Sequence, residues 1–469
     1  MKQDNIIQKV WSLCNILRGD GITYYQYVSE LSYLLFLKIA EENGTETLIP
    51  EGARWADLES HSEEGLLGFY QETLTHLGAT VENEVIKAIY AFPTTVFSHS
   101  ENLKAVIDGI AKIDWHQVGK DGFGDFYSGL IDKSAQDTRS GAGQYFTPRP
   151  LVEAIVKLTK PALGELIQDP ATGSGGFLVA ANDYILRANS IKEYKSNPPK
   201  YQGVEIEKNT RRICLMNTFL HGLDAEIIYG DALTDDAESL EPANIILANP
   251  PFGSKAGSKR PLRNDIPFPN SNKQLAFLQH IYLGLKPGGR AAVVLPDNIL
   301  FEGGVAKAIR TELMDKCNLH TILRLPTGIF YAAGVKTNVL FFSMQGDENQ
   351  RTKNIWIYDM RANMPKFGKT SPLEYKHFED FIHCFGDDPY GLSPRQDQGG
   401  NGRFRCYTRE AIAKRGDNLD ISWLSDDESV SDLTDIDEIM TAIVGHLNSA
   451  LLDIEAIADE LADTVKLRD

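Results

Sequence analysis

Residues 166–177 read LIQDPATGSGGF, an apolar run that leads into a glycine-rich turn and then into the start of a helix. Glycine lets the backbone of such a turn approach a ligand closely, and free amides at a helix start favour a carboxylate or phosphate. The dinucleotide fingerprint would need a further glycine at position 178, which is Leu178. The stretch therefore predicts a strand–turn–helix unit that binds a cofactor, with a nicotinamide dinucleotide disfavoured.

Short apolar runs alternate with amphipathic segments outward from this stretch, over residues 144–345. Such alternation is typical of an α/β domain with a mainly parallel sheet. We expect strands near residues 165–169, 201–206, 226–229, 243–248, 289–295, 320–325 and 337–343. The predicted fold is a doubly wound, mostly parallel sheet of seven strands, in which ligands bind beyond the carboxyl ends of the central strands.

A helical region precedes this domain. Residues 1–130 space their apolar residues as helices do, and residues 31–40, interrupted by Lys38, are too short to span a bilayer and are predicted to form a core helix. The α/β domain is assigned residues 131–415, although the pattern of residues 350–415 is mixed. The N-terminus lacks a signal-peptide pattern, and five scattered cysteines argue against disulfides and a zinc site. We therefore expect a cytoplasmic protein without a metal.

The C-terminal region, residues 416–469, is strongly acidic. It holds 15 Asp and Glu against 2 Lys and Arg, a net charge of −13 out of −18 for the whole chain. After an acidic linker, apolar residues from Ile436 to Leu461 alternate steps of four and three, which is a coiled-coil period. This helix could pack on its own protein, but the length of the pattern favours a role in subunit assembly.

Two acidic residues lie at the ends of the next two predicted strands, Glu205 in GVEIE and Asp231 in YGDA. A carboxylate at the first position can accept both hydroxyls of a ribose, and one at the second can accept from an adenine amine. Each alone is more often a surface or capping carboxylate. The order of glycine-rich turn, Glu and Asp on successive strand ends indicates S-adenosylmethionine. The predicted cofactor-binding residues are Asp169, Thr172, Gly173, Ser174, Gly175, Gly176, Glu205 and Asp231.

The most specific motif ends the apolar run of residues 244–252, NIILANPPF. The amine of adenine is a poor nucleophile because its lone pair is delocalised, so a site must hold it by acceptors that draw its hydrogens out of the ring plane. Asn249 and Pro250 can offer these acceptors, Pro251 helps to fix their directions, and Phe252 can stack on a base extruded from a duplex. The alternative is a strand-terminating turn; the preceding cofactor motifs favour methylation of adenine N6 in DNA. The Pro-Cys nucleophile of cytosine-C5 methylation is missing.

Four basic residues follow this motif in a segment that also contains Gly and Ser: Lys255, Lys259, Arg260 and Arg263. Such a loop can follow DNA phosphates beside the target pocket, or it can simply be solvated. Without its tail the chain is nearly neutral, so we expect a partner to supply much of the contact with DNA.

These motifs resemble those of the modification (M) subunit of type I restriction–modification systems, a γ-class adenine-N6 methyltransferase. The segments that carry the resemblance are GAGQYFTPR (141–149), the turn after Asp169, NPPF (249–252), GGRAAVVLP (288–296), LPTGIF (325–330) and GVKTNV (334–339). They cover about residues 120–345 in the family's order, and the helical front and acidic tail are similar too.

The resemblance implies further site residues and partners. The segment that closes over the methionine part of the cofactor would comprise Gln144, Tyr145, Phe146, Thr147, Pro148 and Arg149. A specificity subunit would select the DNA site, two copies of this chain would join each specificity subunit, and a separate motor-nuclease would complete the complex. The chain has no obvious target-recognition domain of its own, which fits this division.

Three other functions compete with this one. Asn-Pro-Pro-aromatic sites also serve planar amides, so the substrate could be a protein glutamine; such enzymes are much smaller and usually end the motif in Tyr. A lone DNA-modifying defence enzyme would share the core, but the short C-terminal region disfavours it. A cofactor-binding scaffold without activity is disfavoured by intact Asn249 and Phe252.

Overall fold

The computed structural model describes residues 2–18, 21–119, 122–135, 146–253, 260–330, 336–344, 351–362, 364–365, 367 and 371–424. The chain divides into two compact units. The first holds Met1–Phe146, Gly173–Val179 and Glu207–Ile227, and the second holds Thr147–Thr172, Ala180–Ile206 and Ile228–Asp469.

The first unit is helical, as the sequence predicts. Its helices are α1 (Lys2–Ser12), α2 (Cys14–Arg18), α3 (Tyr24–Asn43), α4 (Trp55–Ser60), α5 (Leu66–Thr80), α6 (Glu84–Ile89), α7 (Ser100–Ala111), α8 (Phe123–Ala135) and α12 (Lys208–Leu220). The central helix is α3, which begins with a capping box between Thr23 and Gln26 and ends at Gly44 in a left-handed conformation. Every residue from Tyr27 to Ala40 is buried, which confirms the predicted core helix.

Helix α12 comes late in the sequence but packs against α3. Its Arg212 lies over the ring of Tyr33, with 3.9 Å from the guanidinium carbon to the ring centre, and donates to the Ser29 hydroxyl. Next to Ser29, the buried carboxyl of Glu30 accepts from the Tyr70 hydroxyl at 2.7 Å. Burial raises the pKa of Glu30. A buried polar network therefore stabilises the helical unit in addition to apolar packing.

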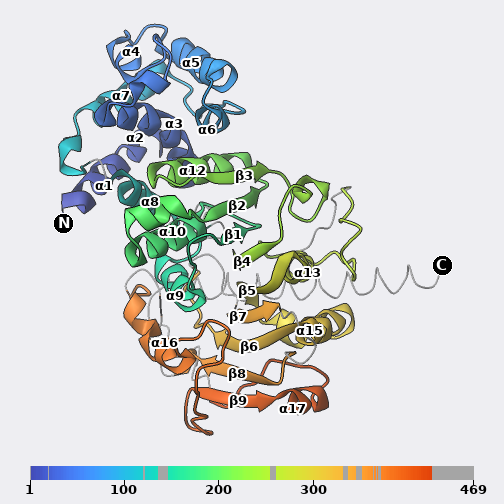
Figure 1. Cartoon of the computed structure of the whole chain (residues 1–469). Helices are drawn as coiled ribbons and strands as arrows, with labels where there is room; N and C mark the ends of the chain where they lie inside the picture. Colours follow the sequence, from blue (N-terminus) through green and yellow to red (C-terminus); the bar gives the residue numbers. More distant parts are fainter. Residues whose placement is uncertain are drawn as a thin grey trace. The chain divides into compact units, whose positions relative to one another are not determined.

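The α/β region is built on one sheet of nine strands (Figure 1). The strands are β1 (Leu166–Asp169), β2 (Lys200–Glu205), β3 (Ala225–Tyr229), β4 (Ala243–Ala248), β5 (Leu285–Pro296), β6 (Cys317–Arg324), β7 (Thr337–Met344), β8 (Asn354–Asp359) and β9 (Phe404–Thr408). All seven predicted strands are present. The expected count of seven is wrong, because β8 and β9 extend the sheet within the region whose pattern is mixed.

The strand order is β3-β2-β1-β4-β5-β7-β6-β8-β9. Strand β1 pairs in parallel with β2 and β4, β4 with β5, and β6 with β8. Strand β7 runs antiparallel to β5 and β6, and β9 runs antiparallel to β8. The carboxyl ends of β2, β1, β4, β5, β6 and β8 therefore lie at one edge of the sheet, where the predicted site residues emerge.

Helices cover both faces of the sheet (Figure 1). On one face, α13 (Lys273–Gly284) contacts β4 and β5, and α15 (Gly304–Lys316) contacts β6. On the other face, α9 (Arg149–Thr159) contacts β5 and α16 (Glu379–Phe385) contacts α9. The remaining helices of the α/β region are α10 (Gly176–Ala188), α11 (Ile191–Ser196), α14 (Asn298–Phe301) and α17 (Arg409–Lys414).

Residues 416–424, the start of the acidic region, pack on the second unit. Arg324 donates to the Asp420 carboxylate, the Ser422 hydroxyl and the Ile421 carbonyl, and the Trp423 indole donates to the Gly402 carbonyl. The predicted coiled-coil helix falls within residues 425–469, outside the described residues.

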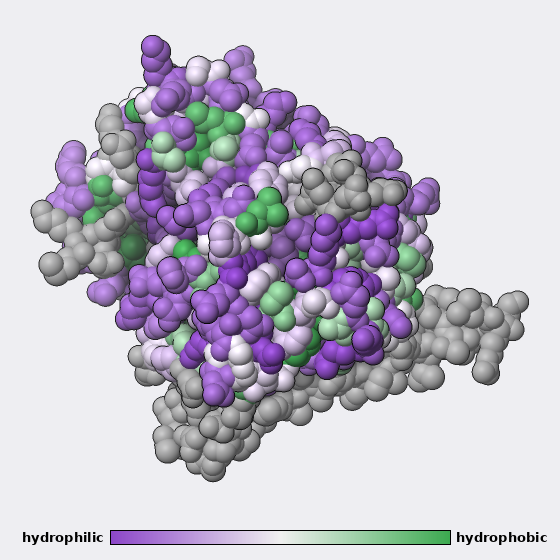
Figure 2. All heavy atoms as spheres, turned by 60° about the horizontal axis from the view of Figure 1, so that its bottom comes forward, coloured by the Kyte–Doolittle hydropathy of each residue, from purple (hydrophilic) through white to green (hydrophobic). Residues whose placement is uncertain are grey.

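Hydrophilic residues predominate on the face drawn in Figure 2, and hydrophobic ones lie there in small separate groups. In the part of the chain that the structure describes, no helix combines the length and the apolar character needed to cross a membrane.

Candidate active site

Four predicted site residues stand at the ends of neighbouring strands. Asp169 ends β1, Glu205 ends β2, Asp231 follows β3 and Asn249 follows β4, and these strands are adjacent in the sheet. The Gly230 amide donates to the Glu205 carbonyl at 3.1 Å, which holds the segment before Asp231 beside the end of β2. With about 4.8 Å between strands, the four positions span roughly 15 Å along one edge.

The carboxyl group of Asp169 is strongly perturbed by its surroundings. Burial raises its pKa to about 8, and the nearby charge of Glu205 adds to the rise, while a hydrogen bond from the Ala171 amide opposes it. Glu205 is itself buried. Without a cationic ligand, Asp169 therefore holds its proton for much of the time at neutral pH. Such a pair of buried acids favours a ligand that brings hydroxyl donors or positive charge.

The turn after β1 has the backbone that the glycine-rich motif predicts. The Thr172 amide donates to the Val204 carbonyl of β2 at 3.1 Å, which ties the start of the turn to the sheet. Gly173 and Gly175 both have positive φ, at 54° and 78°. A Cβ on Gly175 would meet Sγ of Cys214 at 2.9 Å. Both the conformation and the space therefore demand glycine at position 175.

The two polar atoms of the Asn249 side chain differ in their hydrogen bonding. Its amide nitrogen donates to the Thr147 hydroxyl at 3.1 Å. Its Oδ1 is buried and has no hydrogen-bond partner among the described residues. Since a buried acceptor without a partner is costly, this oxygen is suited to accept from a ligand. Pro250 is buried beside it, and Phe252 is half-buried.

Other predicted cofactor residues have different surroundings. Gln144 and Tyr145 lie outside the described residues, and Phe146 is buried. Pro148 caps α9, and Arg149, the first residue of that helix, pairs with Glu153 at 3.0 Å. Thr147 contacts Asn249, whereas the resemblance assigned it to the cofactor. The roles of these residues stay predictions.

The basic loop is only partly described. Lys255 and Lys259 lie outside the described residues. Arg260 makes two hydrogen bonds to Asp236, at 2.7 and 2.6 Å, and they lower the pKa of that carboxyl to about 2. Arg263 binds Asp265 with two nitrogens and also contacts His280. Both arginines would have to exchange these partners to bind a phosphate, and their predicted contact with DNA stays untested.

Ile206 is a residue that the sequence reasoning missed. It follows Glu205 at the end of β2, and 60% of it is exposed. An apolar side chain in solvent beside the acid predicted to bind a ribose can pack on a flat purine ring. The sequence signal is the isoleucine between the two acids of the motif GVEIE.

The fold and the order of these side chains along it are those of an α/β methyltransferase. A family model described as N-6 DNA Methylase matches residues 118–432, and one described as HsdM N-terminal domain matches residues 6–110. The chain belongs to the N-6 DNA methylase family.

Similar proteins cover the full length. The chain is 41% identical to the type I restriction enzyme EcoKI methylase subunit of Escherichia coli (strain K12), over 98% of this chain and 96% of that one. It is 31% identical to the EcoEI methylase subunit of Escherichia coli, over 96% and 97%. The crystal structure of the EcoKI M protein is 37% identical and covers 97% of this chain and 96% of its own, with a TM-score of 0.56. A structure from a type I R-M system, concerned with complex assembly and conformational transition, is 26% identical over 100% and 99%, with a TM-score of 0.73.

Proposed function

We propose that this chain transfers the methyl group of S-adenosylmethionine to the N6 amine of an adenine flipped out of DNA, as the modification subunit of a type I restriction–modification complex. The observation that carries the proposal is the buried, unpartnered Oδ1 of Asn249 at the end of β4. It lies next in strand order to the acids that end β1 and β2. Family membership favours adenine in DNA over a glutamine amide as the substrate.

Asn249 would orient the amine that reacts. Because its amide nitrogen is engaged by Thr147, its oxygen is the atom left to accept from the adenine. The Pro250 carbonyl would be the second acceptor, and two prolines limit the motion of this segment. Hydrogen bonds to both amine hydrogens would localise the lone pair and aim it. Phe252 would stack on the base once it has left the duplex.

The acids on the adjacent strands fit the cofactor, which supplies an electrophilic methyl group. Glu205 would accept from the ribose hydroxyls, Asp231 from the adenine amine, and Ile206 would pack on the ring. The buried carboxyl of Asp169 would be stabilised in its charged form by a nearby sulfonium. The turn Gly173–Gly176 and residues 144–149 complete the proposed cofactor set.

The assembly is a further part of the proposal. Residues 1–130 would form a helical domain, residues 131–415 the methyltransferase domain, and residues 416–469 the acidic segment and helix for subunit assembly. A specificity subunit would select the DNA site, with two copies of this chain per specificity subunit and a motor-nuclease in the full cytoplasmic complex. Lys255, Lys259, Arg260 and Arg263 would contact DNA.

The test is methylation by the complex. The chain is co-expressed with its specificity subunit and incubated with DNA and labelled S-adenosylmethionine, and methyl groups on adenine N6 are counted. Asn249→Ala should abolish the label. Asn244→Ala is the matched control, because Asn244 lies at the opposite end of β4 and its Oδ1 accepts from the Leu166 amide. No label from the wild-type complex despite cofactor binding would refute the proposal, and label from the chain alone would refute the divided complex.

A further inference from the structure

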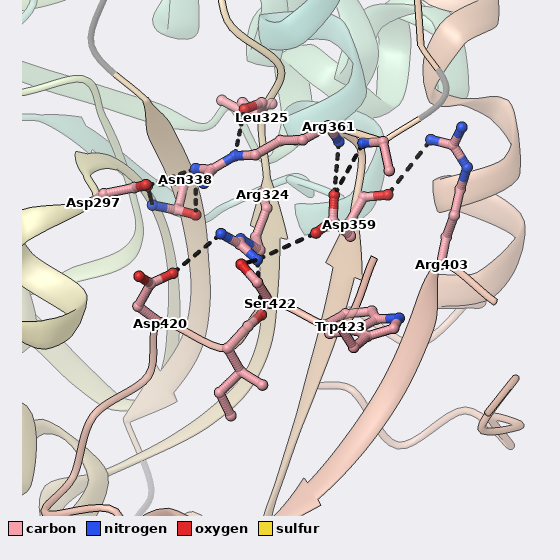
Figure 3. Close-up of polar contacts among 12 residues, drawn as sticks. Asp297, Arg324, Leu325, Asn338, Asp359, Arg361, Arg403, Asp420, Ser422 and Trp423 are labelled. Atoms are coloured by element: carbon pink, nitrogen blue, oxygen red, sulfur yellow. Dashed lines mark hydrogen bonds and ion pairs between the residues drawn. The ribbon is translucent and has the colours of Figure 1, made fainter. Parts of the chain in front are cut away.

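Arg361 lies just beyond the end of β8, with its side chain extended across the ends of other strands (Figure 3). It makes two hydrogen bonds to the Asp297 carboxylate, at 2.9 and 2.5 Å, and donates to the carbonyls of Leu325 at 3.0 Å and Thr337 at 3.1 Å. Only 4% of its side chain is exposed. One guanidinium thus joins the segment after β5, the segment after β6 and the start of β7.

Further hydrogen bonds connect the residues around the Arg361 guanidinium. The Asn338 amide donates to Asp297 at 2.7 Å, and the backbone amide of Arg361 donates to Asp359 at 2.8 Å (Figure 3). Burial would raise the pKa of Asp297, but Arg361 and Asn338 outweigh burial and lower it. The network is therefore charged and intact at neutral pH.

Three sequence motifs that the proposed function leaves unexplained meet at this network. GGRAAVVLP ends directly before Asp297, LPTGIF begins at Leu325, and GVKTNV contains Thr337 and Asn338. These residues precede Arg361 by 64, 36, 24 and 23 positions. The second and third motifs therefore supply acceptors to Arg361 themselves, and the first leads directly into its carboxylate partner.

The network lies on the side of Asn249 away from the cofactor acids. The acids stand at β3, β2 and β1, whereas β5 is the neighbour of β4 on the opposite side. Ala248, the last residue of β4, is in register with Val293, so β5 continues for three residues past the end of β4 before it leads into Asp297. Pro296 is in register with Thr337, so the start of β7 lies beside the end of β5. A base that reaches Asn249 opposite the cofactor would therefore face these segments.

We propose that Arg361 is a positioning residue that fixes the side of the target-adenine pocket opposite the cofactor. The inference rests on the proposed function. Arg361 acts through the segments it holds and does not itself touch the base. Lysine cannot replace it, because a single ammonium cannot span a carboxylate and two carbonyls in fixed planar directions.

A matched control residue lies in the same sheet, toward the strand ends opposite those that carry the site. Arg290 of β5, in register with Ile245 near the start of β4, binds the Glu165 carboxylate at 2.8 and 3.0 Å and donates to the carbonyls of Thr159 and Lys160 at 2.5 and 2.6 Å. It is as buried as Arg361, with 5% of its side chain exposed. Arg290→Lys therefore disturbs the same chemistry in the same sheet, away from the strand ends that carry the site.

The experiment compares Arg361→Lys and Arg290→Lys in the complex with the specificity subunit. Thermal unfolding, cofactor affinity by titration calorimetry and single-turnover methylation are measured for each. Both variants should lose stability and keep cofactor affinity. Only Arg361→Lys should lose methylation, by about 10- to 100-fold in the single-turnover rate constant, which is the scale of a small misplacement of reacting groups.

Two results would overturn the inference: wild-type methylation by Arg361→Lys, or an equal loss in Arg290→Lys. If Arg361→Lys does not fold, Asp297→Asn and its matched control Glu165→Gln carry the same comparison. Failure of the proposed function is distinguishable, because then the wild-type complex itself leaves adenine unmethylated, and the inference falls with it.

Discussion

Asp169 carries a carboxyl group that is stable in the folded chain mainly as the neutral acid. Its pKa is about 8 when folded and near 3.8 when unfolded, so the folded chain binds more protons between these pH values. The free energy of unfolding therefore falls as pH rises through this window, by at most about 1.4 kcal/mol per pH unit. Asp169→Asn should raise the melting temperature of the cofactor-free chain at pH 8 more than at pH 5.5, while weakening cofactor binding.

Asp236 provides the control for this pH dependence. Its hydrogen bonds with Arg260 lower its pKa to about 2, so its contribution to stability is already complete by pH 5.5. The effect of Asp236→Asn on the melting temperature should thus be the same at pH 5.5 and pH 8. A benefit of Asp169→Asn that is independent of pH would contradict the raised pKa.

Glu205 tests the cofactor assignment through affinity. In the proposed cofactor site, replacing its carboxylate by an amide in Glu205→Gln would weaken two charge-assisted hydrogen bonds to the ribose, each contributing about 1.5–3 kcal/mol. We expect the Kd for S-adenosylmethionine to rise at least about tenfold in titration calorimetry. Glu241→Gln is the control, because Glu241 pairs with Lys200 at the opposite end of β2. Equal affinities for the two variants would remove Glu205 from the site.

The turn between β1 and α10 is an element whose shape can be tested directly. Gly175→Ala should destabilise the chain by about 1–3 kcal/mol, since it combines a positive φ with a contact on α12. Gly222→Ala shares the positive φ, at 66°, but meets nothing within 4 Å, so it measures backbone strain alone. Cys214→Ala should recover part of the loss in Gly175→Ala and none in Gly222→Ala. Equal losses in thermal unfolding for the two glycine variants would show that the contact is unimportant.

At the scale of elements, the sequence predicts what depends on local pattern. The strands that end in Asp169, Glu205 and Ala248 combine apolar runs with a polar residue at or after their end, so these strands could be predicted, and the structure places the proposed site residues at their ends. Strand β9 could not, because FRCYT is short, half-buried and formed by pairing with β8 alone. Arg361 could not be predicted either, because its role also depends on strand pairing. Its acceptors come from distant parts of the sequence and meet only when β5, β6 and β7 align.

For the whole molecule, the charge balance predicts dependence on a partner for DNA binding. Outside residues 416–469 the net charge is only −5, and the two described arginines of the basic loop are paired with carboxylates. The isolated chain should bind a DNA duplex with a Kd weaker than about 10⁻⁵ M at physiological salt. Fluorescence anisotropy with and without the specificity subunit measures this. Nanomolar binding by the chain alone would contradict a divided complex.

The C-terminal region divides at Leu424 into a part that we expect to stabilise the fold and a part that we expect to serve subunit assembly. Residues 416–424 are held by the body of the protein, with Asp420 in an ion pair to the buried Arg324. Truncation after Leu424 should therefore leave the melting temperature and cofactor affinity unchanged, while abolishing co-elution with the specificity subunit in size-exclusion chromatography. Truncation after Arg415 also removes partners of Arg324, and should cost about 3–5 kcal/mol of unfolding free energy. A chain ending at Leu424 that still forms an active complex would show that the heptad pattern serves another purpose, and that assembly relies on surfaces within the two compact units.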